Sequence, residues 1–347
     1  YNGNYGLNAS WTLYNGNKRL KTIQQEKLNN QVAELDVATS ENNIQESIAQ
    51  VYIQILYAAE SVKVNESTLQ VSIAQRDRGQ ELLNAGSIAK SDFAQLEAQV
   101  STDRYQLVTA QATLEDYKLQ LKQLLELDGE NEMNIYLPAL SDENVLAPLP
   151  TKKDVYIRAL SLRPEIEASK LNVEASELGI GIAKSSYLPT ISLSAGIGTN
   201  HTSGSDFTFG EQVKNGWNNS IGLSVSVPIF NNRQTKSAVQ KAKLQYETSM
   251  LSLLDEQKTL YKTIEGLWLD ANSAQQRYAA ANEKLKSTQI SYELISEQFN
   301  LGMKNTIELL TEKNNLLQAQ QEQLQAKYMA ILNMQLLKFY QGDQLAI

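Results

Sequence analysis

The 347-residue chain has no cysteine, one histidine, six prolines and no long apolar segment. The absence of cysteine excludes disulfides and thiol chemistry within the chain, and it fits an oxidising compartment without proving one. No stretch approaches the roughly 18–20 uninterrupted apolar residues that a membrane-spanning helix requires. The net charge is −8 and basic residues form no tract, which argues against a nucleic-acid partner.

The sequence also lacks the motifs of common catalytic sites. The one histidine, His201, is expected in a solvated loop, and no cysteine or second histidine could complete a transition-metal site with it. Phosphate-binding loops, nucleophile elbows and complete dinucleotide-binding motifs are missing, because Gly179-Ile180-Gly181 and Gly196-Ile197-Gly198 each lack a third glycine. We therefore expect no enzymatic activity, no metal and no cofactor.

The chain does contain two copies of one pattern, 216 residues apart. A single offset over more than a hundred residues fits long helices, since an insertion would rotate every later side chain off its face. Each copy is typical of a short alternating strand followed by a very long helix. The landmarks that repeat include Glu81-x-x-Asn84-x-Gly86 with Glu297-x-x-Asn300-x-Gly302, and Leu121-Lys122 with Leu337-Lys338.

The first copy has no counterpart of the segment that precedes Ile221 in the second copy. We expect the counterpart of residues 128–220, including one strand, to lie upstream of Tyr1. The chain would then lack its N-terminal part.

Long helices are predicted in both copies. Residues 17–78 contain neither proline nor glycine, and Gly79 should weaken the helix without ending it. A helix running on to Asn84 would rise about 100 Å. Asn84-Ala85-Gly86-Ser87 then predicts a turn before a second helix at about 90–126. In the second copy we expect helices at about 233–300 and 305–340, with the turn at Leu301-Gly302-Met303.

The segment between the copies is more varied. Residues 128–150 are loop-rich, and residues 151–186 predict one or two shorter helices, one of them starting near Leu162-Arg163-Pro164-Glu165. Apolar residues then alternate with serine and glycine at 191–197 and at 221–227, which predicts two strands. A polar loop is expected between them, at residues 199–219.

These strands have one apolar face and one face of serine and glycine. A water-soluble sandwich alternates in the same way, but a membrane barrel places its apolar face toward lipid and small polar residues toward the lumen. We favour the barrel because aromatic residues sit at the strand ends, as in an interfacial girdle. Two full strands and one partial strand cannot close a barrel, so other copies of the chain must complete it. The aromatic residues are Trp11, Tyr14, Tyr187, Trp217 and Phe230.

The chain resembles the TolC-type outer-membrane efflux protein family over essentially its whole length. The resemblance rests on the order and spacing of several features: the strand exits at 11–16 and 227–232, Leu162-Arg163-Pro164-Glu165, Ala183-x-x-x-Tyr187-Leu188-Pro189, and the turns at Gly86 and Gly302. It implies a mostly α fold with a small β part, in which duplicated strand and long-helix units form a trimeric, twelve-stranded outer-membrane β-barrel on a periplasmic α-helical coiled-coil barrel.

The resemblance also implies a division of the chain. Residues 1–15 and 187–230 would form barrel strands and an extracellular loop, and residues 16–127 the first helical hairpin of the periplasmic tunnel. Residues 128–186 would form an equatorial connecting region with short helices. Residues 231–342 would form the second hairpin, and residues 343–347 a C-terminal tail.

The implied function is the outer-membrane exit duct of a tripartite efflux or type I secretion system, a passive channel for small molecules or polypeptides. The implied partners are two further copies in a homotrimer, a periplasmic adaptor (membrane fusion protein), an inner-membrane pump of RND or ABC type, and outer-membrane lipid. The alternative is a trimeric coiled-coil fibre or stalk without channel activity. A fibre would explain the heptad pattern of the first long helix but neither the strands nor the paired turns. The residues of that pattern are Ile44, Ile48, Val51, Ile55, Ala58 and Val62.

Site residues follow from the same resemblance. In the family, the helical turns at the tunnel tip contact the adaptor, and acidic residues six positions beyond each glycine line or latch the entrance. A simpler interpretation is that the glycines end helices and the acids favour helix starts. By position, the adaptor-contact residues are Asn84, Gly86, Ser87, Asn300, Gly302 and Met303, and the periplasmic gate candidates are Glu308, Asp92 and Lys304.

Overall fold

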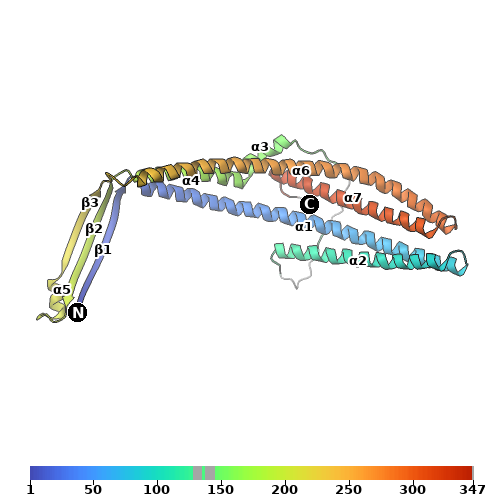
Figure 1. The fold of residues 1–347 in the computed structure, drawn as a ribbon, viewed down its shortest axis with the longest axis horizontal. Helices are drawn as coiled ribbons and strands as arrows, with labels where there is room; N and C mark the ends of the chain where they lie inside the picture. The colour runs from blue at the N-terminus through green and yellow to red at the C-terminus, as the bar shows by residue number, and fades with distance from the viewer. Residues whose placement is uncertain (128–134, 137–144, 346–347) are drawn as a thin grey trace. The chain divides into compact units, whose positions relative to one another are not determined.

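A computed structural model describes residues 1–127, 135–136 and 145–345, and most of them are helical (Figure 1). The loop predicted at 128–150 and the tail predicted at 343–347 lie partly outside the described residues. No described helix is long and apolar enough to cross a membrane. The elements are β1 (Asn2–Asn15), α1 (Lys18–Asn84), α2 (Lys90–Leu124), α3 (Lys152–Leu162), α4 (Pro164–Ser185), β2 (Thr190–Thr202), α5 (Phe209–Asn215), β3 (Asn218–Ser226), α6 (Gln234–Asn300) and α7 (Thr306–Tyr340).

The two copies fold with the same helix bounds. Helices α1 and α6 both have 67 residues, and α2 and α7 both have 35. The offset of 216 maps both ends of each helix in the first copy onto the second. Left-handed backbone repeats too, with φ of 71° and 74° at Gly86 and Gly302, and of 51° and 93° at Glu126 and Gly342. The predicted duplication is confirmed at the level of the backbone.

Most predicted helix ends are confirmed to within two residues. Helix α2 ends at Leu124 rather than near 126, because Glu126 adopts a left-handed conformation that cannot continue a helix. Helix α6 starts at Gln234, directly after Asn232 and Arg233, which both have positive φ. Gly79 lies inside α1 without ending it, as predicted.

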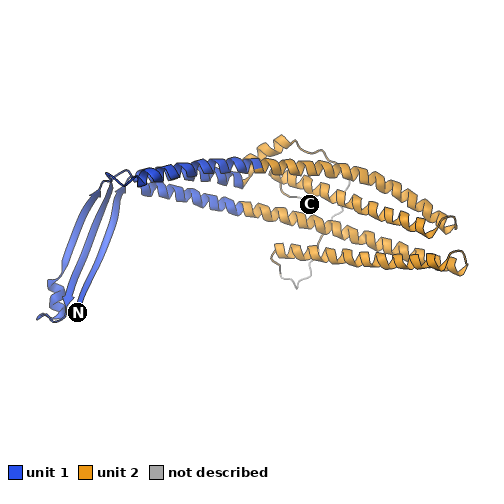
Figure 2. Ribbon diagram, viewed as in Figure 1, with its two compact units in different colours: residues 1–38, 164–258 blue, residues 39–163, 259–347 orange. Residues whose placement is uncertain are grey.

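The described residues form two compact units (Figure 2). Unit 1 comprises residues 1–38 and 164–258, and unit 2 comprises residues 39–163 and 259–347. The division passes through both 67-residue helices. The predicted assignment of segments to barrel, hairpins and connecting region concerns the assembled protein and stays a prediction.

Unit 1 contains an antiparallel sheet in the order β1-β2-β3. Its register sorts residues by polarity across all three strands: Trp11 pairs with Leu193, and Leu193 with Leu223. On the opposite face, Ser194 pairs with Gly222. The pattern seen along each strand is therefore confirmed as one continuous apolar face and one face of small polar residues.

The strand predicted to be partial is the longest of the three. β1 has 14 residues, because Asn2, Gly3 and Asn4 pair with the end of β2 although their composition does not favour a strand. A register shift between Thr12 and Tyr14 marks a β-bulge, which admits one extra residue and bends the strand.

The polar loop predicted at 199–219 is also corrected. β2 continues to Thr202, and the seven-residue helix α5 lies within the supposed loop. Its start is a capping box: Thr208 N–H donates to Glu211 Oε2 (2.9 Å), and Glu211 N–H donates to Thr208 Oγ1 (3.4 Å). Thr208-x-x-Glu211 is a sequence signal for a helix start, and the sequence analysis overlooked it.

Next to the sheet in unit 1, the first turns of α1 pack on α4. Gln25 Nε2 donates to the Ala175 carbonyl (2.8 Å), and Lys21 Nζ donates to the Gly181 carbonyl (3.3 Å). A Cβ at Gly181 would lie 2.9 Å from Lys21 Nζ, so glycine allows this close approach.

Unit 2 has its main hydrophobic core among α1, α6 and α7, where Ile53, Leu56, Tyr278, Ile331 and Leu336 are buried together. The predicted helix start near residue 163 is confirmed, since α3 ends at Leu162 and α4 begins at Pro164.

Arg163 anchors this part of unit 2. Its Nη2 lies 3.2 Å from Glu46 Oε1, and its guanidinium stacks 4.3 Å from the centre of the Tyr340 ring. Arg163 thus ties the end of α3 to both α1 and α7. Glu46 lies on α1 and Tyr340 is the last residue of α7.

Candidate functional site: the paired helical turns

The helix α1 ends in a glycine turn that satisfies its last carbonyl groups. Ser87 N–H donates to the Leu82 carbonyl (2.8 Å), and Gly86 N–H donates to the Leu83 carbonyl (3.0 Å). This pair of bonds is the Schellman motif, which requires a left-handed residue at the position of Gly86. Asn84, the last helical residue, has an exposed side chain that accepts a hydrogen bond from Gln80 Nε2 (3.0 Å).

The helix α6 ends in the same way. Met303 N–H donates to the Gln298 carbonyl (2.8 Å), and Gly302 N–H donates to the Phe299 carbonyl (2.9 Å). Asn300 is the last residue of α6. This turn is more apolar at its surface than the first, because Met303 is exposed beside Leu301, whose exposed fraction is 75%.

Both glycines are required by the backbone conformation and not by packing. A Cβ at Gly86 or Gly302 would meet nothing within 4 Å, so the space beside each turn is open. The two turns lie at the same end of unit 2, where a hydrophobic cluster of Leu96, Phe299 and Leu309 joins α2, α6 and α7 (Figure 1). The structure therefore brings the predicted adaptor-contact residues to one exposed end of this unit.

Glu308 is held at the start of α7 by two kinds of contact. Lys304 Nζ donates to Glu308 Oε1 (2.6 Å), and Asn305 N–H donates to Oε2 (3.2 Å). Asn305 Oδ1 accepts the Glu308 N–H in return (2.9 Å), which completes a capping box. The hydrogen bond from Lys304, followed by that from the Asn305 backbone, lowers the pKa of Glu308 below its usual value.

Asp92 occupies the matching position at the start of α2, with a weaker set of contacts. Its Oδ2 accepts the Ala89 N–H at 3.3 Å, and Ala89 has no side-chain oxygen to complete a capping box. Thus the structure pairs Lys304 with Glu308, whereas among the described contacts Asp92 pairs with neither of them.

A buried ion pair that the sequence did not predict lies deeper in unit 2. Lys313 Nζ donates to Asp103 Oδ2 and to Ser72 Oγ, which links α7, α2 and α1. The exposed fractions of the Lys313 and Asp103 side chains are 3% and 2%. Burial lowers the pKa of Lys313, and the neighbouring Asp103 partly opposes this shift. The repeat contains one sequence signal for burial of Asp103. The matching residue in the second copy is Ala319, and a position that faces solvent as aspartate would not be expected to carry alanine.

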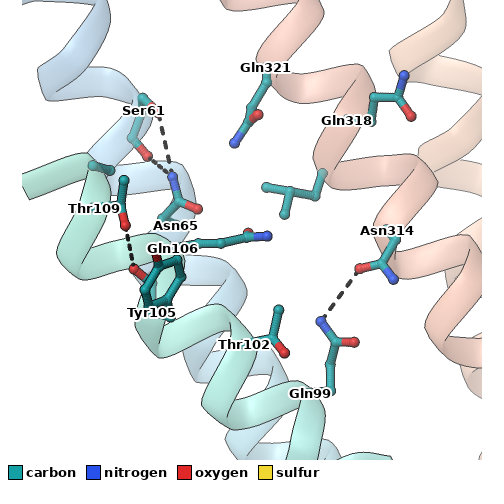
Figure 3. A pocket seen from close by; sticks show the side chains of 12 residues that line it. Ser61, Asn65, Gln99, Thr102, Tyr105, Gln106, Thr109, Asn314, Gln318 and Gln321 are labelled. Carbon is teal, nitrogen blue, oxygen red and sulfur yellow. Dashed lines mark hydrogen bonds between the residues drawn. The ribbon is translucent and has the colours of Figure 1, made fainter. Parts of the chain in front are cut away.

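A polar cavity of about 530 Å³ adjoins this ion pair, between α1, α2 and α7 (Figure 3). Gln99 connects the two, because its Nε2 donates to Asp103 Oδ1 (2.9 Å) and lies 3.5 Å from Asn314 Oδ1. The cavity walls carry amides and hydroxyls but no charged side chain. They comprise Ser61, Asn65, Gln99, Thr102, Tyr105, Gln106, Thr109, Ala110, Asn314, Leu317, Gln318 and Gln321. Among the described residues no group of three or more His, Cys, Asp or Glu could hold a metal ion.

Comparison with known proteins gives a consistent result. Residues 155–342 match the family model of the outer membrane efflux protein. The chain is 24% identical to the outer membrane efflux protein BepC of Brucella suis biovar 1, over 83% of this chain and 60% of that protein. It is 23% identical to the outer membrane protein TolC of Escherichia coli K12, over 87% of this chain and 62% of that protein. The chain therefore spans less than two thirds of the length of these relatives.

The fold is shared with solved structures. The crystal structure of CusC superimposes with a TM-score of 0.84 at 19% sequence identity, over 99% of this chain and 78% of that chain.

Proposed function

The chain belongs to the outer membrane efflux protein family, and on this premise we propose that it is one protomer of a passive exit duct in the bacterial outer membrane. The duct would extend into the periplasm and serve a tripartite efflux or type I secretion system. It would conduct its cargo without catalysing a reaction.

The observation that carries this proposal is the apolar face of the three-stranded sheet. Ile221, Leu223 and Val225 on β3 are all well exposed, and the register continues this face across β2 and β1. Burying a face of this size against lipid would remove the cost of exposing it to water. The opposite face of serine and glycine suits the aqueous lumen of a barrel.

The sheet also supports assembly as a homotrimer. β1 and β3 are edge strands, and an open sheet edge is not tolerated in the hydrocarbon region of a membrane. We propose that three copies, each with a fourth strand, close a twelve-stranded barrel. The helices α1 and α6 would build the tunnel, and a 67-residue helix rises about 100 Å.

We propose that the two glycine turns contact a periplasmic adaptor, which links the duct to an inner-membrane pump of RND or ABC type. The open space beside Gly86 and Gly302 and the exposed side chain of Met303 support this role. Glu308, with Lys304 and Asp92, would control the entrance. Threefold symmetry would gather three Glu308 carboxylates around one axis, and such a ring would favour cations.

The fibre or stalk remains the second candidate, and the long helices are the observation that favours it. A solid fibre does not explain why the sheet exposes an apolar face that continues across all three strands. Its assembly would also leave the strand edges unexplained.

Mass measurement of the full-length protein in detergent tests the assembly. The duct predicts three chains per particle and a requirement for detergent to keep the particle soluble. A soluble rod that needs no detergent would support the fibre, and a monomer or dimer as the main species would contradict the trimeric duct.

A further inference from the structure

We propose that the helix α5 is a lipid anchor: it folds onto the outer wall of the barrel and lies at the level of the lipid headgroups, outside the lumen. This inference rests on the proposed function, because it requires the apolar face of the sheet to face lipid. It concerns the segment between β2 and β3, which had been predicted to be an irregular loop.

The strand residues next to α5 belong to the apolar face of the sheet. The register pairs Tyr5 with Thr199 and Gly3 with His201. Since side chains alternate along a strand, Tyr5, Thr199 and His201 lie on the same face as the apolar residues Leu7 and Ile197. The face of serine and glycine is the opposite one.

The helix α5 contacts side chains on this apolar face. The centre of the Phe209 ring lies 5.0 Å from that of His201 and 6.4 Å from that of Tyr5. Thr199 Oγ1 donates to the carbonyl of Val213 (2.9 Å). A segment that plugged the lumen would contact the face of serine and glycine instead.

The helix α5 is fixed to the end of β2. Thr202 N–H donates to Gln212 Oε1 (2.9 Å), which ties the end of β2 to the helix. After α5 the chain passes the edge of β2 at Gly216, where a Cβ would lie 3.1 Å from Thr199 Oγ1 on the apolar face and 2.6 Å from Asn200 Oδ1 on the opposite face. Figure 1 shows α5 beside the end of the sheet.

The segment that contains α5 exposes aromatic residues. Phe209 within the helix, Phe207 before it and Trp217 after it are each more than half exposed, and Lys214 of α5 is exposed too. Aromatic rings favour the boundary between hydrocarbon and headgroups, and a lysine there can extend its amine into the headgroups.

The position along the strand fits this boundary. The apolar side chains of β2 occupy 191–197, a stretch that spans roughly 20 Å at the rise of a strand. The apolar band of a membrane barrel is about 25 Å tall and is flanked by aromatic girdles. Thr199 and His201, on which α5 rests, therefore lie where the band ends.

These 347 residues contain no cysteine. Once any cysteine elsewhere in the full-length protein is replaced, single cysteines can be labelled with nitroxide at chosen sites. We would reconstitute the full-length protein into phosphatidylethanolamine–phosphatidylglycerol vesicles and label Phe207→Cys and Trp217→Cys. Electron paramagnetic resonance then compares relaxation by oxygen, which concentrates in lipid, with relaxation by a water-soluble nickel chelate. Leu223→Cys is the control for the lipid face, and Ser224→Cys is the control for the lumen face.

The proposal predicts labels at 207 and 217 with an oxygen-to-nickel ratio between those of the two controls and closer to Leu223→Cys. A ratio equal to that of Ser224→Cys, with Leu223→Cys lipid-exposed, would overturn the anchor and leave the barrel intact. An aqueous environment at Leu223→Cys would overturn the barrel itself, and the anchor with it.

A second measurement keeps the native residue in place. These 347 residues contain three tryptophans, so Trp11→Phe/Trp268→Phe leaves Trp217 among them, and any tryptophan elsewhere in the full-length protein is also replaced by phenylalanine. Its fluorescence should be quenched when the vesicles contain lipids brominated near the headgroup end of the acyl chain. No quenching from any bromine position would contradict the anchor.

Discussion

Lys313 and Asp103 form a buried ion pair that joins α7 to α2, and so joins the second helical hairpin to the first. The duplicated halves differ at both positions, because Lys313 matches Glu97 and Asp103 matches Ala319. A contact between two related hairpins requires complementary residues rather than identical ones. The divergence of the two copies is therefore visible where they meet inside unit 2.

Removing one partner of this pair should destabilise the protein strongly, because the other charge would stay buried. We expect Lys313→Met to cost about 3–5 kcal/mol, and Asp103→Ala to cost a similar amount. The double variant Asp103→Ala/Lys313→Met should lose far less than the sum of the two. Thermal or denaturant unfolding of the assembled protein measures these costs.

The matched control is the exposed pair of Lys284 and Glu322, whose side chains are 43% and 40% exposed. Lys284→Met should change stability by less than about 1 kcal/mol. Equal effects of Lys284→Met and Lys313→Met would show that burial of the pair of Lys313 and Asp103 has no energetic consequence.

The glycines of the long helices should respond to alanine in opposite directions. Gly266→Ala should stabilise the protein by about 0.5–1 kcal/mol, because the site is helical and a Cβ there meets nothing within 4 Å. Gly79→Ala should destabilise it by about 1 kcal/mol or more, because the Cβ would clash with Cδ1 of the buried Leu96. Melting temperatures of the two variants decide this. A higher melting temperature for Gly79→Ala would contradict the close approach of Leu96 to this position.

At the turns, Gly302→Ala should cost about 1–2 kcal/mol, because φ is 74° there and alanine is strained in that conformation. The space beside the turn is open, so a steric clash adds nothing. Gly302→Asn should recover part of the loss, since asparagine tolerates left-handed backbone. Equal stability of Gly302→Ala and the parent protein would mean that the turn relaxes into another conformation.

Replacing Arg163 should loosen the junction of α1, α3 and α7. We expect Arg163→Ala to cost about 2–4 kcal/mol, because the side chain is 7% exposed and its guanidinium both pairs with Glu46 and stacks on Tyr340. Arg163→Lys retains the charge but loses the planar stacking, so it should recover only part of the stability. Full recovery in the lysine variant would show that stacking contributes little.

The Glu308 carboxylate should set the charge preference of the duct. In single-channel recordings on planar bilayers, Glu308→Gln should lower the preference for cations and weaken block by divalent cations, because glutamine removes the charge of the ring. Unchanged selectivity and block in a correctly assembled trimer would mean that Glu308 serves only to start α7.

Low pH should lower the preference for cations, as Glu308→Gln does, because protonation also removes the charge of the Glu308 carboxylate. The pKa of Glu308 is lowered from its usual 4.5, so the carboxylate and its stabilising contacts are fully present above pH 4.5 and are lost as the pH falls through the lower value in the folded protein. In the trimer, repulsion among the three carboxylates opposes this lowering of the pKa. Selectivity carried by Glu308 should therefore fall as the pH drops, and the repulsion moves this loss toward higher pH. Reversal potentials measured against pH test this, and Glu308→Gln should lack that part of the titration.

The sequence predicted the large elements because their signals are long or repeated. A proline-free stretch with a heptad pattern predicted the first long helix, and the constant offset between the two copies predicted the matching helices of the second copy. Gly86 and Gly302 predicted the turns. Strand alternation predicted the apolar face that the register of Trp11, Leu193 and Leu223 confirms.

What sequence reasoning missed depends on pairing in space. The first residues of β1 become a strand through their pairing with β2, and the extra length has no compositional signal. The ion pair of Lys313 and Asp103 joins residues 210 positions apart, which no local pattern could connect. By contrast, α5 could have been predicted, since Thr208 and Glu211 form a local capping box.

Conductance of the full-length protein in a planar bilayer tests the central claim most directly. A trimeric duct with a polar lumen predicts discrete, stable current steps that favour cations, with selectivity reduced in Glu308→Gln. Trimers that insert into the bilayer and yet carry no current would contradict the account.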